Sequence, residues 1–149
     1  MNTSTTEKIK LVCPQCASIN QFHASRPIED AKCGKCSAHL IAKAPIVVTL
    51  SVLEKHILHS ALPVLVDFWA PWCGPCKSFA PTFERYAATQ AAVIRCLKLN
   101  TEEQQQAGIK FNIRSIPTLA LFKGGVEVSR ISGAMNVQQL TDWVQQHKR

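Results

Sequence analysis

The sequence predicts an α/β protein in which a small zinc-ribbon-like module precedes a domain built on one central mixed β-sheet flanked by helices. Two observations carry this prediction. Residues 46–149 alternate strand-like and helix-like segments in the order β-α-β-α-β-α-β-β-α. Residues 1–45 are polar, contain two Cys-x-x-Cys pairs and lack the apolar runs needed for a core of their own. We therefore place a joint at Pro45 and expect two parts, 1–45 and 46–149.

The first half of the second part shows clear local signals. Residues 45–50, PIVVTL, have the composition of a short strand. Ser51 and Glu54 have the spacing of a capping box, which predicts a helix to about Ser60. Residues 63–70, PVLVDFWA, are almost continuously apolar, which is typical of a strand covered on both faces.

The next segments continue the alternation. We expect a helix from about residue 73 to 89, followed by a strand over residues 92–100, AVIRCLKLN. Thr101 with Gln104 predicts the cap of a short helix that ends at Gly108.

The last segments predict a hairpin and a helix. Residues 116–131, IPTLALFKGGVEVSRI, form two strand-like runs with Gly124 and Gly125 at the turn. Asn136 with Gln139 caps the last helix. Its apolar stripe consists of Leu140, Trp143 and Val144.

Composition and charge narrow the function classes. The net charge of +7 is spread over the chain and contains no run of five Lys or Arg residues, so nucleic-acid binding is not favoured. The N-terminus lacks the apolar core of a signal peptide, and no apolar run is long enough for a membrane span. We expect a cytoplasmic protein. Its seven cysteines then indicate metal ligands, redox groups or buried thiols rather than a disulfide framework.

Four of the cysteines have the spacing of a zinc site. Cys13 and Cys16 are separated by sixteen residues from Cys33 and Cys36. Each tight turn can direct two sulfurs at one ion, and two such turns complete a tetrahedron. Four thiolates leave no open position, so we expect one structural zinc ion, which would supply folding free energy on the order of 10 kcal/mol. Iron in the same geometry, disulfides and free thiols are the alternatives.

Another cysteine pair, Cys73 and Cys76, lies between a buried strand and the start of a helix. This context indicates a redox dithiol. The helix N-terminus favours a thiolate at Cys73, and Cys76 lies one turn away, close enough to form a disulfide with it. Pro75 is tolerated in the first turn, and Gly74 leaves the approach to Cys73 open.

The string DFWAPWCGPC, followed by RSIPTLALF, resembles the thioredoxin family over residues 46–149. With the four-cysteine module in front, the chain resembles the bacterial thioredoxin 2 type. The resemblance implies a thioredoxin fold and a protein-disulfide reductase. Cys73 would attack the substrate disulfide, and Cys76 would resolve the mixed disulfide.

The resemblance also implies roles for Asp67, Lys98 and Pro117. An acid within an apolar strand has a raised pKa, so we expect Asp67 to act as a general base for Cys76, with a purely structural core acid as the alternative. Lys98 matches the family's lysine near that acid, and Ile116-Pro117 matches its cis-proline. The expected substrate surface consists of Trp72, Gly74, Pro75, Ile116, Gly133 and Ala134.

The expected partners are protein disulfides and an NADPH-dependent thioredoxin reductase, with no nucleic acid or membrane and a monomeric chain. Two rival functions stay open: a disulfide oxidant or isomerase, and a zinc-ribbon binding module fused to a degenerate thioredoxin fold. Our working hypothesis for the module is redox or partner tuning, which rests on the expectation that the four thiolates lie near the dithiol. Cys96 should be a buried small hydrophobe, with a regulatory thiol as the alternative. His56 and His59 should lie on a solvated or half-buried helix face.

Overall fold

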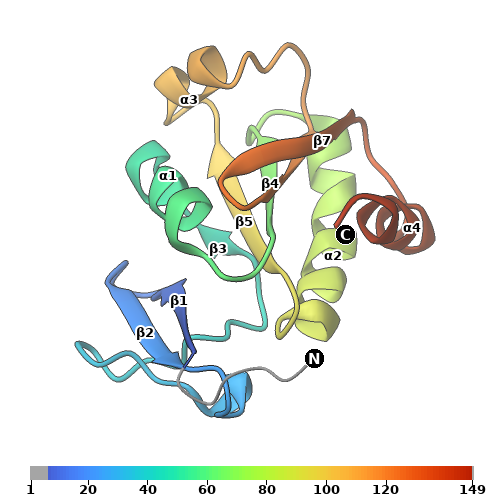
Figure 1. Cartoon of the computed structure of the whole chain (residues 1–149). Helices are drawn as coiled ribbons and strands as arrows, with labels where there is room; N and C mark the ends of the chain where they lie inside the picture. The colour runs from blue at the N-terminus through green and yellow to red at the C-terminus, as the bar shows by residue number, and fades with distance from the viewer. Residues whose placement is uncertain (1–6, 149) are drawn as a thin grey trace.

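The computed structural model describes residues 7–148. They form a two-stranded sheet and a five-stranded sheet with helices on both faces (Figure 1). The strands are β1 (Lys8–Val12), β2 (Ile19–His23), β3 (Ile46–Val47), β4 (Val64–Trp69), β5 (Arg95–Asn100), β6 (Thr118–Lys123) and β7 (Val126–Ser132). The helices are the 3-10 turn η1 (Ile28–Asp30) and the α-helices α1 (Leu50–His59), α2 (Gly74–Gln90), α3 (Gln105–Lys110) and α4 (Val137–His147).

The larger sheet has the strand order β3-β5-β4-β6-β7, which confirms the predicted central mixed sheet. β3, β5 and β4 are parallel, whereas β6 and β7 are antiparallel to their neighbours. Figure 1 shows α1 and α3 on one side of the sheet and α2 and α4 on the other. None of the helices within residues 7–148 is both long and apolar enough to cross a membrane.

The two core layers follow from alternation along β4. Leu65 packs in a cluster that contains Phe79 of α2 and Trp143 of α4. Its neighbour Val66 packs on the opposite face, in a cluster that contains Leu53 of α1. Because successive strand residues point to opposite faces, a strand buried on both sides needs an almost unbroken apolar sequence. β4 therefore lies at the centre of the sheet.

The start of α1 differs from the sequence prediction. β3 covers only two residues, and Thr49, rather than Ser51, caps the helix, with its hydroxyl accepting from Val52 N at 3.3 Å. The predicted capping box at Ser51 and Glu54 is therefore wrong. Thr49 can serve because it is extended, as an N-cap residue must be, whereas Ser51 already lies in the first turn.

The predicted cap of α3 is also wrong. The helix starts at Gln105 and runs to Lys110, and no side chain caps it. Thr101 instead donates from Oγ1 to Trp69 O at 3.0 Å, and the Gln104 side chain accepts from Leu50 N at 2.9 Å. Both polar side chains serve contacts between elements distant in sequence, which a local motif does not reveal.

The predicted hairpin and the last helix are confirmed. Gly124 and Gly125 have φ of 60° and 83°, so the turn uses the conformations that glycine adopts without strain. Asn136 and Gln139 form a complete capping box at the start of α4. This part of the chain follows its local sequence signals closely.

The four-cysteine module packs against one end of the larger sheet. Its hairpin β1–β2 joins Lys8 to His23 in register. A small apolar cluster combines Leu11 and Leu40 of the module with Leu62 and Ala91 of the second part. Leu62 lies two residues before β4, and Ala91 follows α2, so the module covers the end at which β4 and β5 begin. The division at residues 45 and 46 stays a prediction.

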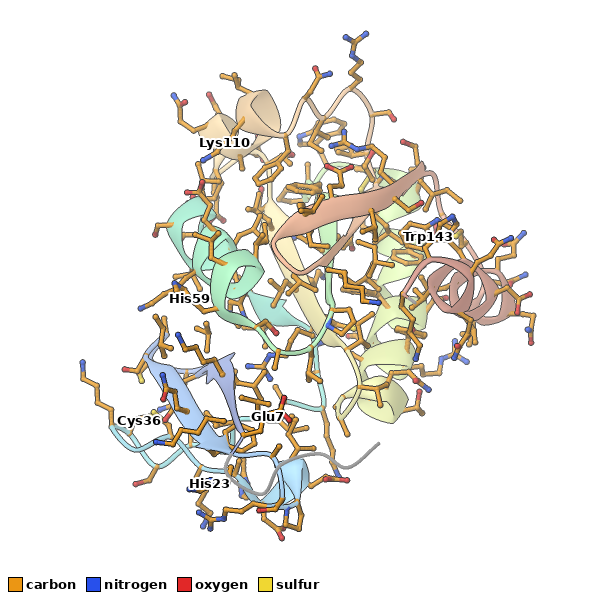
Figure 2. All side chains as sticks on the ribbon, in the orientation of Figure 1. Glu7, His23, Cys36, His59, Lys110 and Trp143 are labelled. Atoms are coloured by element: carbon orange, nitrogen blue, oxygen red, sulfur yellow. A yellow bond between two sulfur atoms is a disulfide. The ribbon has the colours of Figure 1, made fainter. Side chains whose placement is uncertain are left out.

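Two further side chains bear on the sequence predictions. Cys96 is buried, as expected, and burial raises the pKa of its thiol to about 12. His56 is fully buried, so the expectation of a solvated or half-buried face is wrong. Burial, together with the charge of Arg95, lowers the pKa of His56 to about 3, which keeps it neutral. His59, labelled in Figure 2, is the last residue of the same helix and is only partly buried.

Candidate dithiol site and metal centre

Cys73 is the N-cap residue of α2 and is joined to Cys76 by a disulfide, with a Cα–Cα distance of 5.2 Å. A turn after β4, in which Cys73 N donates to Ala70 O at 3.2 Å, places the first cysteine at the helix entrance. Cys76 N donates to Cys73 Sγ at 3.1 Å. Pro75 lies in the first turn, where its missing N–H costs no helical hydrogen bond. The free N–H groups and dipole of this terminus stabilise negative charge on Cys73.

The surface around the dithiol is open on one side. Cys73 is only 4% exposed, but its neighbour Trp72 is 68% exposed. Gly74 and Pro75 are also exposed, and a side chain added at Gly74 would meet no atom within 4 Å. A large flat partner can therefore approach the pair from this side.

The predicted docking residues of the second half lie beside the dithiol. The peptide bond Ile116-Pro117 is cis, and Ile116 O lies 3.7 Å from Cys73 Sγ. Gly133 N donates to Pro117 O at 2.9 Å, so the segment after β7 meets the segment that holds the cis-proline. Gly133 has φ of 98°, a conformation that glycine adopts without strain. Ala134 is exposed next to Gly133.

Asp67 is almost fully buried in the centre of β4, on the face that α2 covers. Its Oδ1 atom has no hydrogen-bond partner among the described residues. Burial raises the pKa of Asp67 to about 7, against an opposing effect of Lys98 on the neighbouring strand. Lys98 Nζ lies 4.6 Å from the centroid of the Trp69 ring, in cation–π geometry. Asp67 can therefore exchange a proton near neutral pH.

The second site is the cluster of Cys13, Cys16, Cys33 and Cys36, whose sulfurs all lie within 4.8 Å of one another. Two of the sulfur–sulfur distances are 3.5 Å and 3.6 Å, and none of the four is in a disulfide. Ligands about 2.3 Å from a common centre in a tetrahedron lie about 3.8 Å apart. The cluster therefore fits a zinc ion held by four thiolates. Figure 2 shows Cys36 in the module.

Backbone amides surround the sulfurs. Gln15 N and Cys16 N each donate to Cys13 Sγ at 3.4 Å, and Lys35 N donates to Cys33 Sγ at 3.3 Å. Such bonds stabilise thiolates, because they place N–H dipoles on the negative sulfur. Each turn ends in a residue with positive φ, 63° at Ala17 and 68° at Ser37.

Two residues close to this cluster escaped the sequence analysis. Asn20 donates from Nδ2 to Cys33 Sγ at 3.5 Å and accepts at Oδ1 from Gly34 N at 2.9 Å. Arg95, at the start of β5, is hydrogen bonded to Val12 and Leu40 of the module. Neither residue belongs to a motif, and both come close to the cysteines only through the fold.

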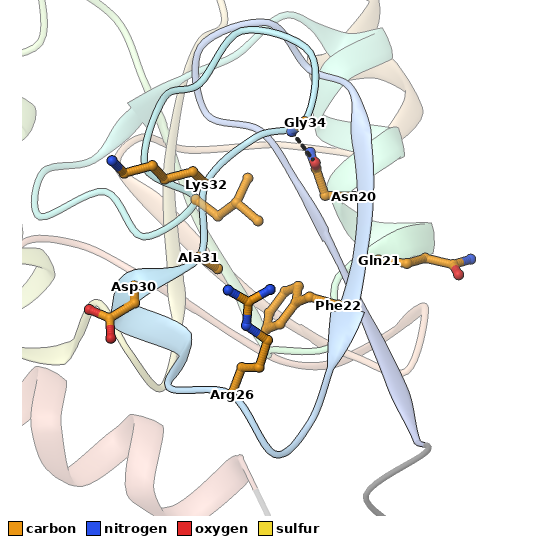
Figure 3. Close-up of a pocket in the computed structure, with 9 residues that line it drawn as sticks. Asn20, Gln21, Phe22, Arg26, Asp30, Ala31, Lys32 and Gly34 are labelled. Atoms are coloured by element: carbon orange, nitrogen blue, oxygen red, sulfur yellow. Dashed lines mark hydrogen bonds between the residues drawn. The ribbon is translucent and has the colours of Figure 1, made fainter.

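The module also contains a pocket of about 310 Å³ beside β2 (Figure 3). Asn20, Phe22, Arg26 and Lys32 are among its lining residues, and the Asn20–Gly34 hydrogen bond crosses one edge of it. Figure 3 shows the Arg26 guanidinium directed toward the Phe22 ring. None of the dithiol residues lines this pocket.

The two cysteine sites lie at opposite ends of the parallel strands. Arg95 begins β5 next to the module, whereas Asn100 ends β5 beside Thr101, whose N–H donates to Trp69 O at 2.8 Å on the dithiol side. Six strand residues at about 3.3 Å each separate the ends by roughly 16 Å. The expectation that the four thiolates lie near the dithiol is therefore wrong.

Comparison with known proteins links each part to a described family. Residues 44–146 match the family model "Thioredoxin", and residues 12–38 match the model "Thioredoxin 2, N-terminal", a zinc ribbon. Thioredoxin C-3 of Corynebacterium nephridii is 38% identical over 136 residues, which covers 91% of this chain and 93% of the relative. Thioredoxin 1 of Nostoc sp. is 44% identical over 100 residues, or 67% of this chain and 94% of the relative.

A solved structure shows the same fold. The crystal structure of Malassezia sympodialis thioredoxin (Mala s 13) superposes with a TM-score of 0.62 at 30% sequence identity. The match covers 69% of this chain and 90% of the other.

Proposed function

The chain belongs to the thioredoxin family, and we propose on this premise that it reduces protein disulfides through Cys73 and Cys76 while a zinc ion stabilises its N-terminal module. Membership of the family makes it a thiol-disulfide oxidoreductase with disulfide reductase activity. The observation that carries the assignment of residues is the position of Cys73 Sγ, at the N-terminus of α2 and 3.7 Å from Ile116 O.

The reaction proceeds in two exchanges. In the reduced chain, the Cys73 thiolate attacks one sulfur of the substrate disulfide, and the other substrate sulfur leaves as a thiolate that takes up a proton. Cys76 then loses its proton and attacks Cys73 Sγ, which expels the second substrate sulfur. Two electrons pass from the Cys73–Cys76 dithiol to the substrate, and the chain returns to the disulfide form that the structure contains.

Asp67 acts as the proton acceptor for Cys76 in the second exchange, through water. Support comes from its position under α2 and from its pKa, which burial raises to about 7. A base of this pKa is half protonated near neutral pH, where it can both accept and return a proton. Lys98 opposes part of the effect of burial on this pKa and keeps the value within the useful range.

The substrate segment docks on the surface made by the exposed Trp72, the Gly74–Pro75 turn, Ile116 with Pro117, and Gly133 with Ala134. Ile116 O and the open approach at Gly74 support this assignment, because they leave backbone groups accessible beside Cys73. A flavoprotein reductase that draws electrons from NADPH would return the dithiol to its reduced form.

The four cysteines of the module hold one structural zinc ion. The sulfur–sulfur distances of 3.5 Å and 3.6 Å and the N–H donors on Cys13 and Cys33 support this ligand set. Four thiolates complete the tetrahedron, so the ion supplies folding free energy and no open coordination position for catalysis.

The test compares the wild type with Cys73→Ser in the reduction of insulin disulfides, with zinc content measured on both. We expect the variant to lose activity and to keep one zinc per chain. The two sites are independent if both results hold. A loss of a full equivalent of zinc in Cys73→Ser would contradict the separation of the cysteines, and retained activity would contradict the role of Cys73.

A further inference from the structure

Arg95 links the two parts of the chain. It is the first residue of β5 and is only 2% exposed. Its Nη1 atom donates to Leu40 O and its Nη2 atom donates to Val12 O, so both bonds reach into the module. One planar side chain from the second part of the chain, residues 46–149 (the catalytic domain), therefore contacts two separate segments of the module.

These two segments flank the two cysteine turns. Val12 immediately precedes Cys13, so its carbonyl belongs to the peptide bond that carries the first ligand. Leu40 follows the second cysteine pair, and its N–H donates to Ala31 O at 3.0 Å, which closes the loop around Cys33 and Cys36. Arg95 thereby joins the residue before the first turn to the loop that encloses the second.

The charge of Arg95 has no carboxylate partner among residues 7–148. The ion pairs within that range join Lys110 to Glu54 and Arg130 to Glu127. A buried guanidinium without a counter-charge is costly, because carbonyl groups replace only part of the water that it loses. A negative group must therefore be sought among its other neighbours.

The neighbouring titratable groups of the catalytic domain do not supply that charge. Cys96 is buried next to Arg95, and burial raises the pKa of its thiol to about 12, so it stays protonated. His56 is buried and neutral near physiological pH. The cluster of four cysteines, which starts directly after Val12, is the remaining source of negative charge.

We propose that Arg95 is an outer residue of the zinc centre that compensates its charge and holds its two turns together. Four thiolates around a divalent ion carry a net charge of about −2. The centre is then composite, with ligands from the module and the counter-charge from the catalytic domain. This inference depends on the zinc binding proposed above.

Arginine suits this position better than lysine. The guanidinium is a rigid planar fork that can donate to two carbonyls at once, whereas an ammonium on a flexible stem would favour one of them. The conservative variant Arg95→Lys thus keeps the charge and weakens the bridge. Arg95→Met removes both the charge and the bridge at similar length.

The test measures the rate at which the reduced, zinc-loaded full chain releases zinc to an excess of a chromogenic chelator. Loss of an outer partner of a metal site typically costs 10-fold to 100-fold in metal affinity, so we expect Arg95→Met to release zinc about 10-fold to 100-fold faster. Arg95→Lys should show a smaller increase, about threefold to tenfold. Leu99→Ala is the matched control, since Leu99 is buried on the same strand but packs in a different cluster from the module.

The outcomes separate this inference from the proposed zinc site. A wild-type chain that binds no zinc would overturn both. A zinc-loaded wild type with unchanged release in Arg95→Met would overturn only the role of Arg95. Equal acceleration in Leu99→Ala would also overturn it, because general destabilisation would then explain the effect. If Arg95→Met does not fold, Arg95→Lys decides, and release at the wild-type rate would count against the bridge.

A second measurement needs no variant. Binding to the folded state alone stabilises it, so zinc removal from the reduced wild type should lower the unfolding midpoint reported by tryptophan fluorescence. All three tryptophans, Trp69, Trp72 and Trp143, lie in the catalytic domain. An unchanged midpoint would show that the two parts are not coupled and would overturn the proposal.

Discussion

The two cysteine sites differ in what surrounds the same Cys-x-x-Cys spacing. At one end of β4 and β5, Cys73 and Cys76 lie at a helix entrance, next to the exposed Trp72. At the other end, two turns of the module bring four sulfurs within 4.8 Å of one another. A cysteine pair at a helix terminus can form and break a disulfide, whereas two pairs that face one another can bind one metal ion. The difference shows that the chemistry of cysteine pairs depends on their neighbours.

The largest effect should come from removing a ligand of the zinc site. Cys33→Ser removes a ligand, so we expect near-complete loss of zinc and a drop of several kcal/mol in the free energy of unfolding, part of the roughly 10–16 kcal/mol that zinc supplies in small modules. Chain that remains folded should still reduce disulfides, because the dithiol lies at the far end of the strands. Metal analysis and urea unfolding check the first two points. Loss of activity per folded molecule would refute the separation.

The next effect concerns the buried acid on the redox side. Its folded-state pKa of about 7 lies above the ordinary value of 3.8, so the folded state binds more protons between these values, and wild-type stability falls as pH rises through them. Asp67→Asn removes this loss. At about 1.4 kcal/mol per unit, we expect it to stabilise the oxidised chain by up to about 4 kcal/mol above pH 7 and by little below pH 4.

Urea unfolding of the oxidised wild type and Asp67→Asn across this pH range checks the prediction. The zinc release rate serves as the control and should not change, because Asp67 does not contact the module. A stability difference that is independent of pH would show that burial does not perturb this carboxyl group in the way the structure indicates.

A smaller effect is expected at the docking surface. Trp72 is 68% exposed, so Trp72→Ala should change the free energy of unfolding by less than about 0.5 kcal/mol. Its loss should raise KM for insulin about tenfold, as expected for an aromatic contact at the centre of an interface. Ile109→Ala is the control, because Ile109 is 73% exposed but lies on α3. An equal rise in KM for both variants would argue against a specific surface around the dithiol.

The smallest expected effect concerns Asn20, which lies beside the zinc ligands. Asn20→Ala removes a long bond to Cys33 Sγ and a stronger one to Gly34 N. We expect zinc release to accelerate about threefold, with unchanged insulin reduction. This is below the 10-fold to 100-fold effect that is typical when an outer partner of a metal site is lost. Release slower than in the wild type would show that Asn20 does not stabilise the second cysteine turn.

Strong local patterns in the sequence were sufficient to predict most of the fold. The apolar run of β4, the two glycines of the hairpin and the capping box of α4 each specify their element with residues close in sequence. The capping prediction for α1 failed because the extended Thr49 caps the helix in place of Ser51. The prediction for α3 failed because Gln104 and Thr101 bond to Leu50 and Trp69 instead. A short polar motif has several uses, and the tertiary structure selects among them.

For the candidate sites too, some residues follow from the sequence and others only from the fold. The cysteines follow from spacing alone, and the buried position of Asp67 follows from the apolar strand around it. Arg95 could not be found from the sequence, because an arginine in a strand normally reaches solvent and its partners lie more than fifty residues away. The same holds for the relative position of the two cysteine sites, which depends on where the module packs.

The amide of Cys76, which donates to Cys73 Sγ at 3.1 Å, also provides a spectroscopic handle. The resonance of that proton responds to the electron density on the sulfur that it touches. Its cross-peak in a nuclear magnetic resonance spectrum should therefore shift when the bond between the sulfurs opens. A titration followed at this one signal would read the redox state of the chain directly, without a dye or a coupled enzyme.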